Sequence, residues 1–220
     1  WGNLSNGYVQ LGKTQEAETS CRRAIELNPN LFNCHFLLGT ILLGQKRLKE
    51  AEQSLRKTIE LNPNVFNSHF LLGTILIGQK KLQEAEHSLR KTIELKPDYS
   101  QAYLNLGAVL KDLGKLQEAE VAIRKSIELN PNLFNSHFLL GTILLGQKRL
   151  KEAEQSLRKT IELNPNFFQA HSALGGLLDE LGNLQEAELS TRKAIEIKPD
   201  FAEEHYNLGN ILKDLGNLQE

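Results

Sequence analysis

The octapeptide HFLLGTIL occupies residues 35–42, 69–76 and 137–144. The first two copies begin 34 residues apart, and the second and third begin twice that distance apart. The same interval separates each proline of the chain from the next: Pro29, Pro63, Pro97, Pro131, Pro165 and Pro199. It also separates six glycines (Gly39, Gly73, Gly107, Gly141, Gly175, Gly209) and six alanines (Ala17, Ala51, Ala85, Ala119, Ala153, Ala187). A fixed period of this length predicts an array of structural repeats.

A single repeat, residues 32–65, predicts two helices joined by a short turn. Apolar or small residues recur at helical spacing in 33–44 and again in 49–61, so that each helix has one buried face: His35, Leu38, Gly39 and Leu42 on the first, and Ala51, Leu55, Thr58 and Ile59 on the second. The residues GQKRL between them form the turn. Pro63 ends the second helix because it has no N–H and disfavours helix at Asn62. Neither helix can bury its apolar face alone, so each repeat must pack on its neighbours.

These residues resemble the tetratricopeptide repeat pattern W-x2-L-G-x2-Y…A-x3-F…P. The matching residues are Trp1, Leu4, Ser5, Tyr8, Ala17, Cys21 and Pro29 in the first repeat, His35, Leu38, Gly39, Leu42, Ala51, Leu55 and Pro63 in the second, and Tyr103, Leu106, Gly107, Leu110, Ala119, Ile123 and Pro131 in the fourth. Histidine usually takes the tryptophan position, and Ser5 replaces the glycine of the first repeat. The resemblance covers the whole chain.

The resemblance implies an all-α fold, a right-handed α-α superhelix of six helix-turn-helix repeats plus the first helix of a seventh. We expect a single solenoid over residues 1–220, with repeats at 1–31, 32–65, 66–99, 100–133, 134–167 and 168–201 and a partial repeat at 202–220. Trp1 already lies inside a predicted helix, and Glu220 lies where a second helix should begin. We therefore expect this chain to be a segment of a longer bacterial-type solenoid.

In the family, the second face of each first helix lines a concave groove that binds partners. Carried over by position, the groove would contain Asn33, Phe36, Thr40 and Leu43 in the second repeat, Asn67, Phe70, Thr74 and Ile77 in the third, Leu104 and Lys111 in the fourth, and Asn135, Phe138, Thr142 and Leu145 in the fifth. The sixth and seventh repeats differ at these positions, with Gln169, Ser172, Gly176, Asp179 and Glu180, and with Glu203, Tyr206, Asn210, Lys213 and Asp214. Apolar patches are thus expected at repeats two, three and five, and acidic character at repeat six.

Composition excludes several other classes of function. Lys+Arg 26 against Asp+Glu 27 leaves a net charge of -1, which favours neither a nucleic acid nor an anionic membrane as partner. No apolar run has membrane-spanning length. Five histidines (His35, His69, His137, His171 and His205) occupy one core position in successive repeats, so we interpret them as packing residues and predict neither a metal site nor a cofactor. Cys21 and Cys34 are interpreted as buried thiols of a reducing, cytoplasmic location.

The sequence therefore predicts a non-catalytic scaffold that binds a protein or peptide in its concave groove, with Phe36, Phe70 and Phe138 as apolar anchors. Three alternatives stay open. The segment could be the substrate-recognition arm of a larger enzyme, such as a glycosyltransferase, with its catalytic domain elsewhere. It could be a structural solenoid that self-associates. The groove phenylalanines could also simply pack between neighbouring first helices.

Overall fold

A computed structural model describes residues 13–216 of the chain, and within this range the regular structure consists of twelve α-helices. The first helices of successive repeats are α3 (Phe32–Gly44), α5 (Phe66–Gly78), α7 (Ser100–Asp112), α9 (Phe134–Gly146), α11 (Phe168–Glu180) and α13 (Ala202–Asp214). The second helices are α2 (Thr14–Leu27), α4 (Leu48–Leu61), α6 (Leu82–Leu95), α8 (Leu116–Leu129), α10 (Leu150–Leu163) and α12 (Leu184–Ile197). The predicted all-α class and repeat count are confirmed. The first helix of the first repeat, within which the sequence predicts Trp1 to lie, falls outside the described residues.

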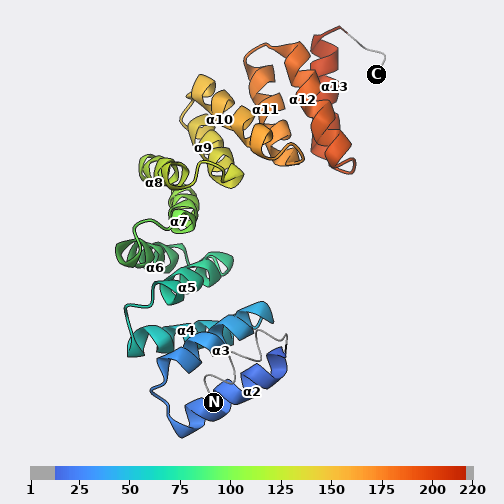
Figure 1. Cartoon of the computed structure of the whole chain (residues 1–220). Helices are drawn as coiled ribbons and strands as arrows, with labels where there is room; N and C mark the ends of the chain where they lie inside the picture. Colours follow the sequence, from blue (N-terminus) through green and yellow to red (C-terminus); the bar gives the residue numbers. More distant parts are fainter. Residues whose placement is uncertain (1–12, 217–220) are drawn as a thin grey trace. The chain divides into compact units, whose positions relative to one another are not determined.

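The chain divides into two compact units, residues 1–113 and 114–220. In the first unit consecutive helices from α2 to α7 pack on each other, and in the second unit the same holds for consecutive helices from α8 to α13 (Figure 1). The first helices of neighbouring repeats also touch, α5 with α7 and α11 with α13. The core of each unit is therefore distributed along its helix pairs, as expected for repeats that contact only their neighbours.

The two helices of a repeat approach closely at a glycine. A Cβ atom built on Gly39 would lie 2.9 Å from Cγ of Leu55, which is fully buried in α4. The same contact joins Gly73 to Leu89 at 3.0 Å and Gly141 to Leu157 at 3.0 Å. Because a leucine side chain occupies the space of the missing methyl group, the glycine allows the helices to close. Burying such a leucine stabilises the fold by about 2 kcal/mol.

The buried surface of the first helices is wider than the sequence pattern predicts. His35, Leu38, Gly39 and Leu42 are buried as expected, but Cys34 and Ile41 are buried as well. The position of Cys34 lies against the second helix of the preceding repeat, because its equivalent Ser136 in α9 has its hydroxyl 2.8 Å from that of Ser126 in α8. The first helix therefore packs between two second helices, which explains why its sequence is apolar on more than one side.

The prediction that five histidines are buried in the core is correct for three of them. His35, His69 and His171 are buried, whereas His137 is half-buried and His205 is exposed. For His205 the predicted burial is therefore wrong, although its ring makes the same bond to a proline carbonyl as the buried histidines do. The two cysteines, Cys21 and Cys34, are both buried, and burial raises the pKa of the Cys34 thiol.

The turn within a repeat exists in two versions. After α3, the N–H of Arg47 bonds to the carbonyl of Leu42 and the N–H of Lys46 to that of Leu43, at 2.9 and 3.0 Å. This arrangement is the Schellman motif, which needs a left-handed residue just after the helix. That residue is Lys46, Lys80 or Lys148 in three repeats, with φ of 61°, 59° and 61°, and Gly114, Gly182 or Gly216 in the other three. Turns with the sequences GQK and LG thus have the same backbone conformation, although only glycine adopts this positive φ without strain.

Candidate functional site

The predicted groove residues lie on one surface of the first helices, here called the first-helix face. In the first unit this face contains Asn33, Phe36, Thr40 and Leu43 on α3, Asn67, Phe70, Thr74 and Ile77 on α5, and Leu104 and Lys111 on α7; in the second unit it contains Asn135, Phe138, Thr142 and Leu145 on α9. The phenylalanines, Leu43, Ile77 and Leu145 are half-buried, and the three asparagines are exposed. Apolar side chains partly open to solvent therefore alternate with exposed amides.

Two of the predicted anchors also contact the aromatic residue at the end of their own repeat, where the chain enters the next first helix. The ring of Phe70 packs edge-to-face with Tyr99, which directly precedes α7, at a centroid distance of 4.9 Å. Phe138 packs in the same way on Phe167, which directly precedes α11, at 5.0 Å. Such contacts stabilise by about 0.5–1.5 kcal/mol beyond the buried area. Part of each ring therefore contributes to packing at the repeat boundary. The residue equivalent to Tyr99 beside Phe36 is Val65, which is not aromatic.

Polar groups on the first-helix face fall into two sets. The hydroxyls of Thr40, Thr74 and Thr142 donate to carbonyls of their own helices, at 2.7, 3.0 and 2.9 Å. These groups are satisfied without a ligand. In contrast, the side chains of Asn33, Asn67 and Asn135 are exposed and make no hydrogen bond within residues 13–216. The asparagines are thus the polar groups that remain available to a bound chain.

The fourth repeat offers less to a ligand than the sequence predicts. Leu104 stands at the phenylalanine position but is only 8% exposed. Its side chain is smaller than phenylalanine and is covered by its neighbours, so it belongs to the core of the first unit. Lys111 is half-buried, and its ammonium lies 3.5 Å from the carboxylate of Asp112. The Asn105 amide, which the prediction did not include, bonds to the Thr74 hydroxyl at 3.5 Å and links α7 to α5.

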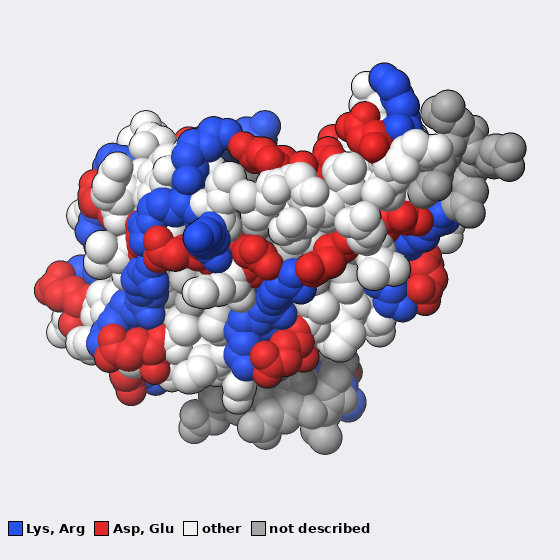
Figure 2. All heavy atoms as spheres, turned by 90° about the horizontal axis from the view of Figure 1, so that it is seen from above, with Lys and Arg blue, Asp and Glu red and all other residues white. Residues whose placement is uncertain are grey.

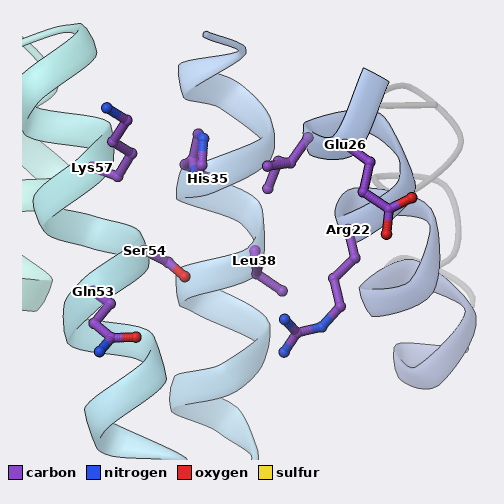
Figure 3. Close-up of a pocket in the computed structure, with 8 residues that line it drawn as sticks. Arg22, Glu26, His35, Leu38, Gln53, Ser54 and Lys57 are labelled. Atoms are coloured by element: carbon purple, nitrogen blue, oxygen red, sulfur yellow. The ribbon is translucent and has the colours of Figure 1, made fainter. Parts of the chain in front are cut away.

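A hollow that the sequence reasoning missed lies between consecutive second helices. In the first unit it measures about 370 Å³, and Figure 3 shows His35 and Leu38 of α3 between α2 and α4. It is lined by Arg22, Ile25 and Glu26 of α2, by His35 and Leu38, and by Gln53, Ser54 and Lys57 of α4. A hollow of about 440 Å³ recurs at the equivalent residues of the second unit, Arg158, Ile161, Glu162, His171, Leu174, Leu189, Ser190 and Lys193. The 34-residue period was the signal that could have located both.

The charged groups at this hollow already have partners. Arg22 bonds to Glu18 and Glu50, at 2.9 and 3.0 Å, and Lys57 pairs with Glu60 at 2.6 Å. In the second hollow Arg158 pairs with Glu154 and Glu186, and Lys193 with Glu196. Because its cations are neutralised, the hollow has no unpaired charge with which to attract an ionic ligand. Its regular occurrence is explained by the packing of two second helices over one first helix.

Ion pairs cover the second helices and the turns. Glu18 of α2 is 4% exposed and accepts hydrogen bonds from Arg22, Gln45 and Arg47. Burial alone would raise the pKa of Glu18, but these bonds outweigh it and hold the pKa below its usual value. Glu120 has the same partners in the second unit, Arg124, Gln147 and Arg149, and its pKa is lowered likewise. Figure 2 shows basic and acidic side chains lying directly against each other on the face in view.

Other kinds of site find little support in the described part of the chain. Residues 13–216 contain no group of three or more His, Cys, Asp or Glu side chains that could hold a metal ion. Among the same residues, none of the helices combines the length and the apolar character needed to cross a bilayer. The predicted histidine position is instead used for a structural bond, since Nε2 of His35 lies 2.8 Å from the carbonyl oxygen of Pro29.

The repeats share paired helices of fixed length, a glycine at each close approach and a proline at each boundary. These features define an α-helical repeat protein whose first helices share an exposed face. More specifically, the chain belongs to the tetratricopeptide repeat family. Models described as tetratricopeptide repeats match residues 1–31, 20–53, 66–99, 100–133, 122–155 and 144–208. A comparison with curated protein sequences gives no significant match.

Solved structures share this fold. YrrB, described as a TPR protein with an unusual peptide-binding site, is 22% identical over 84% of this chain and 96% of its own, with a TM-score of 0.72. The pilF protein of Pseudomonas aeruginosa is 21% identical over 95% of each chain, with a TM-score of 0.80. MamA is 23% identical over 76% of this chain and 97% of its own, with a TM-score of 0.69. At these identities the likeness establishes the tetratricopeptide solenoid fold alone.

Proposed function

We propose that this chain is a non-catalytic scaffold that captures a peptide segment of a partner protein on its first-helix face. The observation that carries the proposal is the combination of half-buried apolar side chains with exposed asparagines on α3 and α5. Phe36, Leu43, Phe70 and Ile77 supply apolar surface, and Asn33 and Asn67 supply amide groups for the main chain of a bound peptide. The peptide-binding site named for YrrB supports the same role for this fold.

The partner is expected to be apolar at its anchor positions. Phe36 and Phe70 are one repeat apart and belong to the same unit, so a single extended or helical segment can contact both. Phe138, in the other unit, supplies an equivalent anchor for a segment bound there. Phe70 keeps one edge on Tyr99, which holds its ring in place before a ligand arrives. Fixing the ring in advance reduces the entropy lost on binding.

The test begins with peptides selected from a displayed random library on the immobilised chain. The affinity of the best peptide is then measured by fluorescence anisotropy for the parent and for Phe36→Glu/Phe70→Glu. A buried charge at both anchors should weaken binding by about tenfold or more. Circular dichroism checks that both proteins have the same helical content.

The chain offers a matched control on its second helices. Val121 and Leu189 are 70% and 68% exposed, on α8 and α12, and lie outside the first-helix face. Val121→Glu/Leu189→Glu makes the same kind of change and should leave the affinity within about twofold. Equal losses in both double variants would contradict the proposal, and so would an unchanged affinity in Phe36→Glu/Phe70→Glu.

Self-association is a second candidate that the same two residues favour. Val121 and Leu189 occupy equivalent positions of repeats four and six, where the other described repeats carry Thr19, Gln53, His87 and Gln155. Exposed aliphatic side chains at one repeated position are suited to a contact between copies. Light scattering across a range of protein concentrations tests this idea. A mass that rises with concentration in the parent but not in Val121→Glu/Leu189→Glu would support it, and a constant monomer mass would exclude it.

A further inference from the structure

The seventh repeat carries a carboxylate at a position that is small elsewhere. The third residue of each first helix is buried against the preceding second helix, and in successive repeats it is Cys34, Ser68, Ala102, Ser136 and Ala170. In α13 it is Glu204, which is 1% exposed. Because alanine fills this place in two repeats, packing alone does not require a glutamate here.

Glu204 points toward α11 but is only partly satisfied. Its Oε1 accepts hydrogen bonds from the Ser172 hydroxyl at 2.7 Å and from the Asn207 amide at 3.4 Å. Its Oε2 is buried and has no hydrogen-bond partner among the described residues. Neither oxygen is paired with a cationic side chain there. A buried polar oxygen without a hydrogen-bond donor destabilises a fold, so a ligand that donates to this oxygen would recover the lost stability.

The surface of α11 beside Glu204 is open where other repeats are filled. Ser172 stands at the position of Phe36, Phe70 and Phe138, and Gly176 stands at the position of the groove threonines. A Cβ atom built on Gly176 meets no atom within 4 Å. Space for a ligand side chain therefore exists one helical turn from the serine that bonds Glu204.

Carboxylates outnumber cations at the groove positions of α11 and α13, which carry Asp179, Glu180, Glu203 and Asp214 against one cation, Lys213. Asp179 is half-buried on α11, and Glu203 and Lys213 are exposed on α13. Unlike the second helices, where carboxylates and cations pair regularly, this part of the second unit combines a buried, uncompensated carboxylate with acidic neighbours. The complementary ligand is a cation that can donate several hydrogen bonds at once. Among protein side chains, the planar guanidinium of arginine fits this description best.

We propose that the face between α11 and α13 binds an arginine side chain of the captured segment, with Glu204 as its counter-ion. The guanidinium enters over Gly176 and takes over from Ser172 and Asn207 as donor to the carboxylate. Rotation about the terminal torsion of Glu204, which has a broad energy profile, lets both oxygens accept a bond. This inference rests on the proposed capture of a peptide and adds a charge requirement to it.

The test uses Nα-acetyl-arginine methylamide as probe and its neutral analogue, Nα-acetyl-citrulline methylamide, as the matched ligand control. Chemical shifts of the isotope-labelled chain are followed during titration. The arginine probe should give saturable shifts centred on Ser172, Gly176, Glu204 and Asn207. The citrulline probe should bind about tenfold more weakly or not at all. Equal binding of the two probes, or no saturable shift at these residues, would overturn the proposal.

Four variants locate the interaction. Glu204→Gln should weaken arginine binding by about tenfold or more. Glu204→Ala should do the same while folding normally, because Ala102 and Ala170 occupy the same position. Gly176→Thr introduces the residue of other repeats into open space and should block entry. Glu203→Gln removes an exposed neighbouring charge and should change the affinity less than about twofold. If Glu203→Gln weakens binding as much as Glu204→Gln does, the acidic surface binds diffusely and the specific site is excluded.

The two proposals can fail separately. The arginine probe contains no apolar anchor, and Phe36 and Phe70 belong to the other unit. Loss of arginine binding in Glu204→Gln with no effect of Phe36→Glu/Phe70→Glu on peptide affinity would reject only the proposed anchors. The reverse result would reject only the arginine site.

Discussion

Nε2 of His69 lies 2.9 Å from the carbonyl oxygen of Pro63, six residues earlier. Pro63 marks the boundary between two repeats, where the second helix has ended and its carbonyl has no helical partner. The same bond recurs between His35 and Pro29, His137 and Pro131, His171 and Pro165, and His205 and Pro199, at 2.8–2.9 Å. Histidine at the tryptophan position of the family thus ties five of the six described first helices to the loop that precedes them, and α7 has Tyr103 at this position.

The first prediction concerns the charge of His69. Burial lowers the pKa of His69 despite its bond to Pro63, so the folded state holds this proton less tightly than the unfolded state. The stability that depends on neutral His69 is present above its unfolded pKa of about 6.5 and is lost as the pH falls through and below that value. His69→Phe should lower the free energy of unfolding near neutral pH by about 1 kcal/mol, because the bond is lost, and the urea midpoint should fall with it. The free energy of unfolding should also depend less on pH.

Urea unfolding of both proteins at about pH 7.5 and about pH 5.5 measures this difference. His205→Phe is the matched control, because His205 makes the same bond to Pro199 but is exposed. It should change the urea midpoint much less than His69→Phe does. A parent and a His69→Phe variant that lose stability equally between the two pH values would contradict the assignment.

The second prediction uses two glycines of one helix. Gly39→Ala places a methyl group 2.9 Å from Cγ of Leu55, which cannot move far inside the core, so we expect about 1–3 kcal/mol of destabilisation. Gly44→Ala, at the end of the same helix, meets nothing within 4 Å and should stabilise by about 0.5–1 kcal/mol. Thermal unfolding of the two variants measures both signs. A loss of stability in Gly44→Ala as large as in Gly39→Ala would show that the contact with Leu55 is not what makes alanine unfavourable at Gly39.

Periodicity was enough to predict the helices, their order and their close contacts. The 34-residue interval repeats the same apolar faces, small residues and helix-ending prolines several times along the chain. The bounds of α3 and α4 differ from prediction by one residue at their N-termini. The sequence pattern did not reveal the additional buried surface at Cys34 and Ile41, because a helix packed between two others has no polar side to mark its orientation.

The site was harder to predict because one residue type can serve two purposes. Phe70 and Phe138 fit an apolar anchor and also pack on Tyr99 and Phe167, and composition alone does not divide a ring between the two roles. Leu104 occupies an anchor position but is buried. Glu204 differs from its counterparts in the sequence, yet its burial and its unpartnered oxygen depend on the neighbouring helix α11.

The third prediction concerns the turn within a repeat. Lys80 has φ of 59°, a conformation that strains residues with a side chain by about 1–2 kcal/mol, and Gly182 takes the equivalent place in the sixth repeat with φ of 74°. Lys80→Gly should therefore stabilise the chain by about 1 kcal/mol, and Gly182→Lys should destabilise it by a similar amount. Thermal unfolding measures both changes. Two shifts of the same sign would show that side-chain contacts of the lysine, and not the backbone, determine the stability of the turn.

The last prediction concerns acid stability at Glu18. Hydrogen bonds from Arg22, Gln45 and Arg47 hold the pKa of this buried carboxylate below its usual value, in spite of burial. A carboxylate with a depressed pKa contributes stability above its unfolded pKa of about 4.3, and that stability is lost as the pH falls through the folded pKa. Glu18→Gln should therefore be about 1–2 kcal/mol less stable than the parent at neutral pH, and this difference should shrink under acid conditions.

The measurement is urea unfolding from neutral pH to about pH 3, with Glu26→Gln as the matched control. Glu26 lies on the same helix and pairs with Arg23 at 2.7 Å, but both side chains are exposed. An exposed pair contributes about 0–1 kcal/mol, so its removal should leave the pH profile nearly unchanged. If Glu18→Gln is less stable than the parent by the same amount in acid as at neutral pH, the loss does not depend on charge. The charged bonds to Arg22 and Arg47 are then not what stabilises this turn.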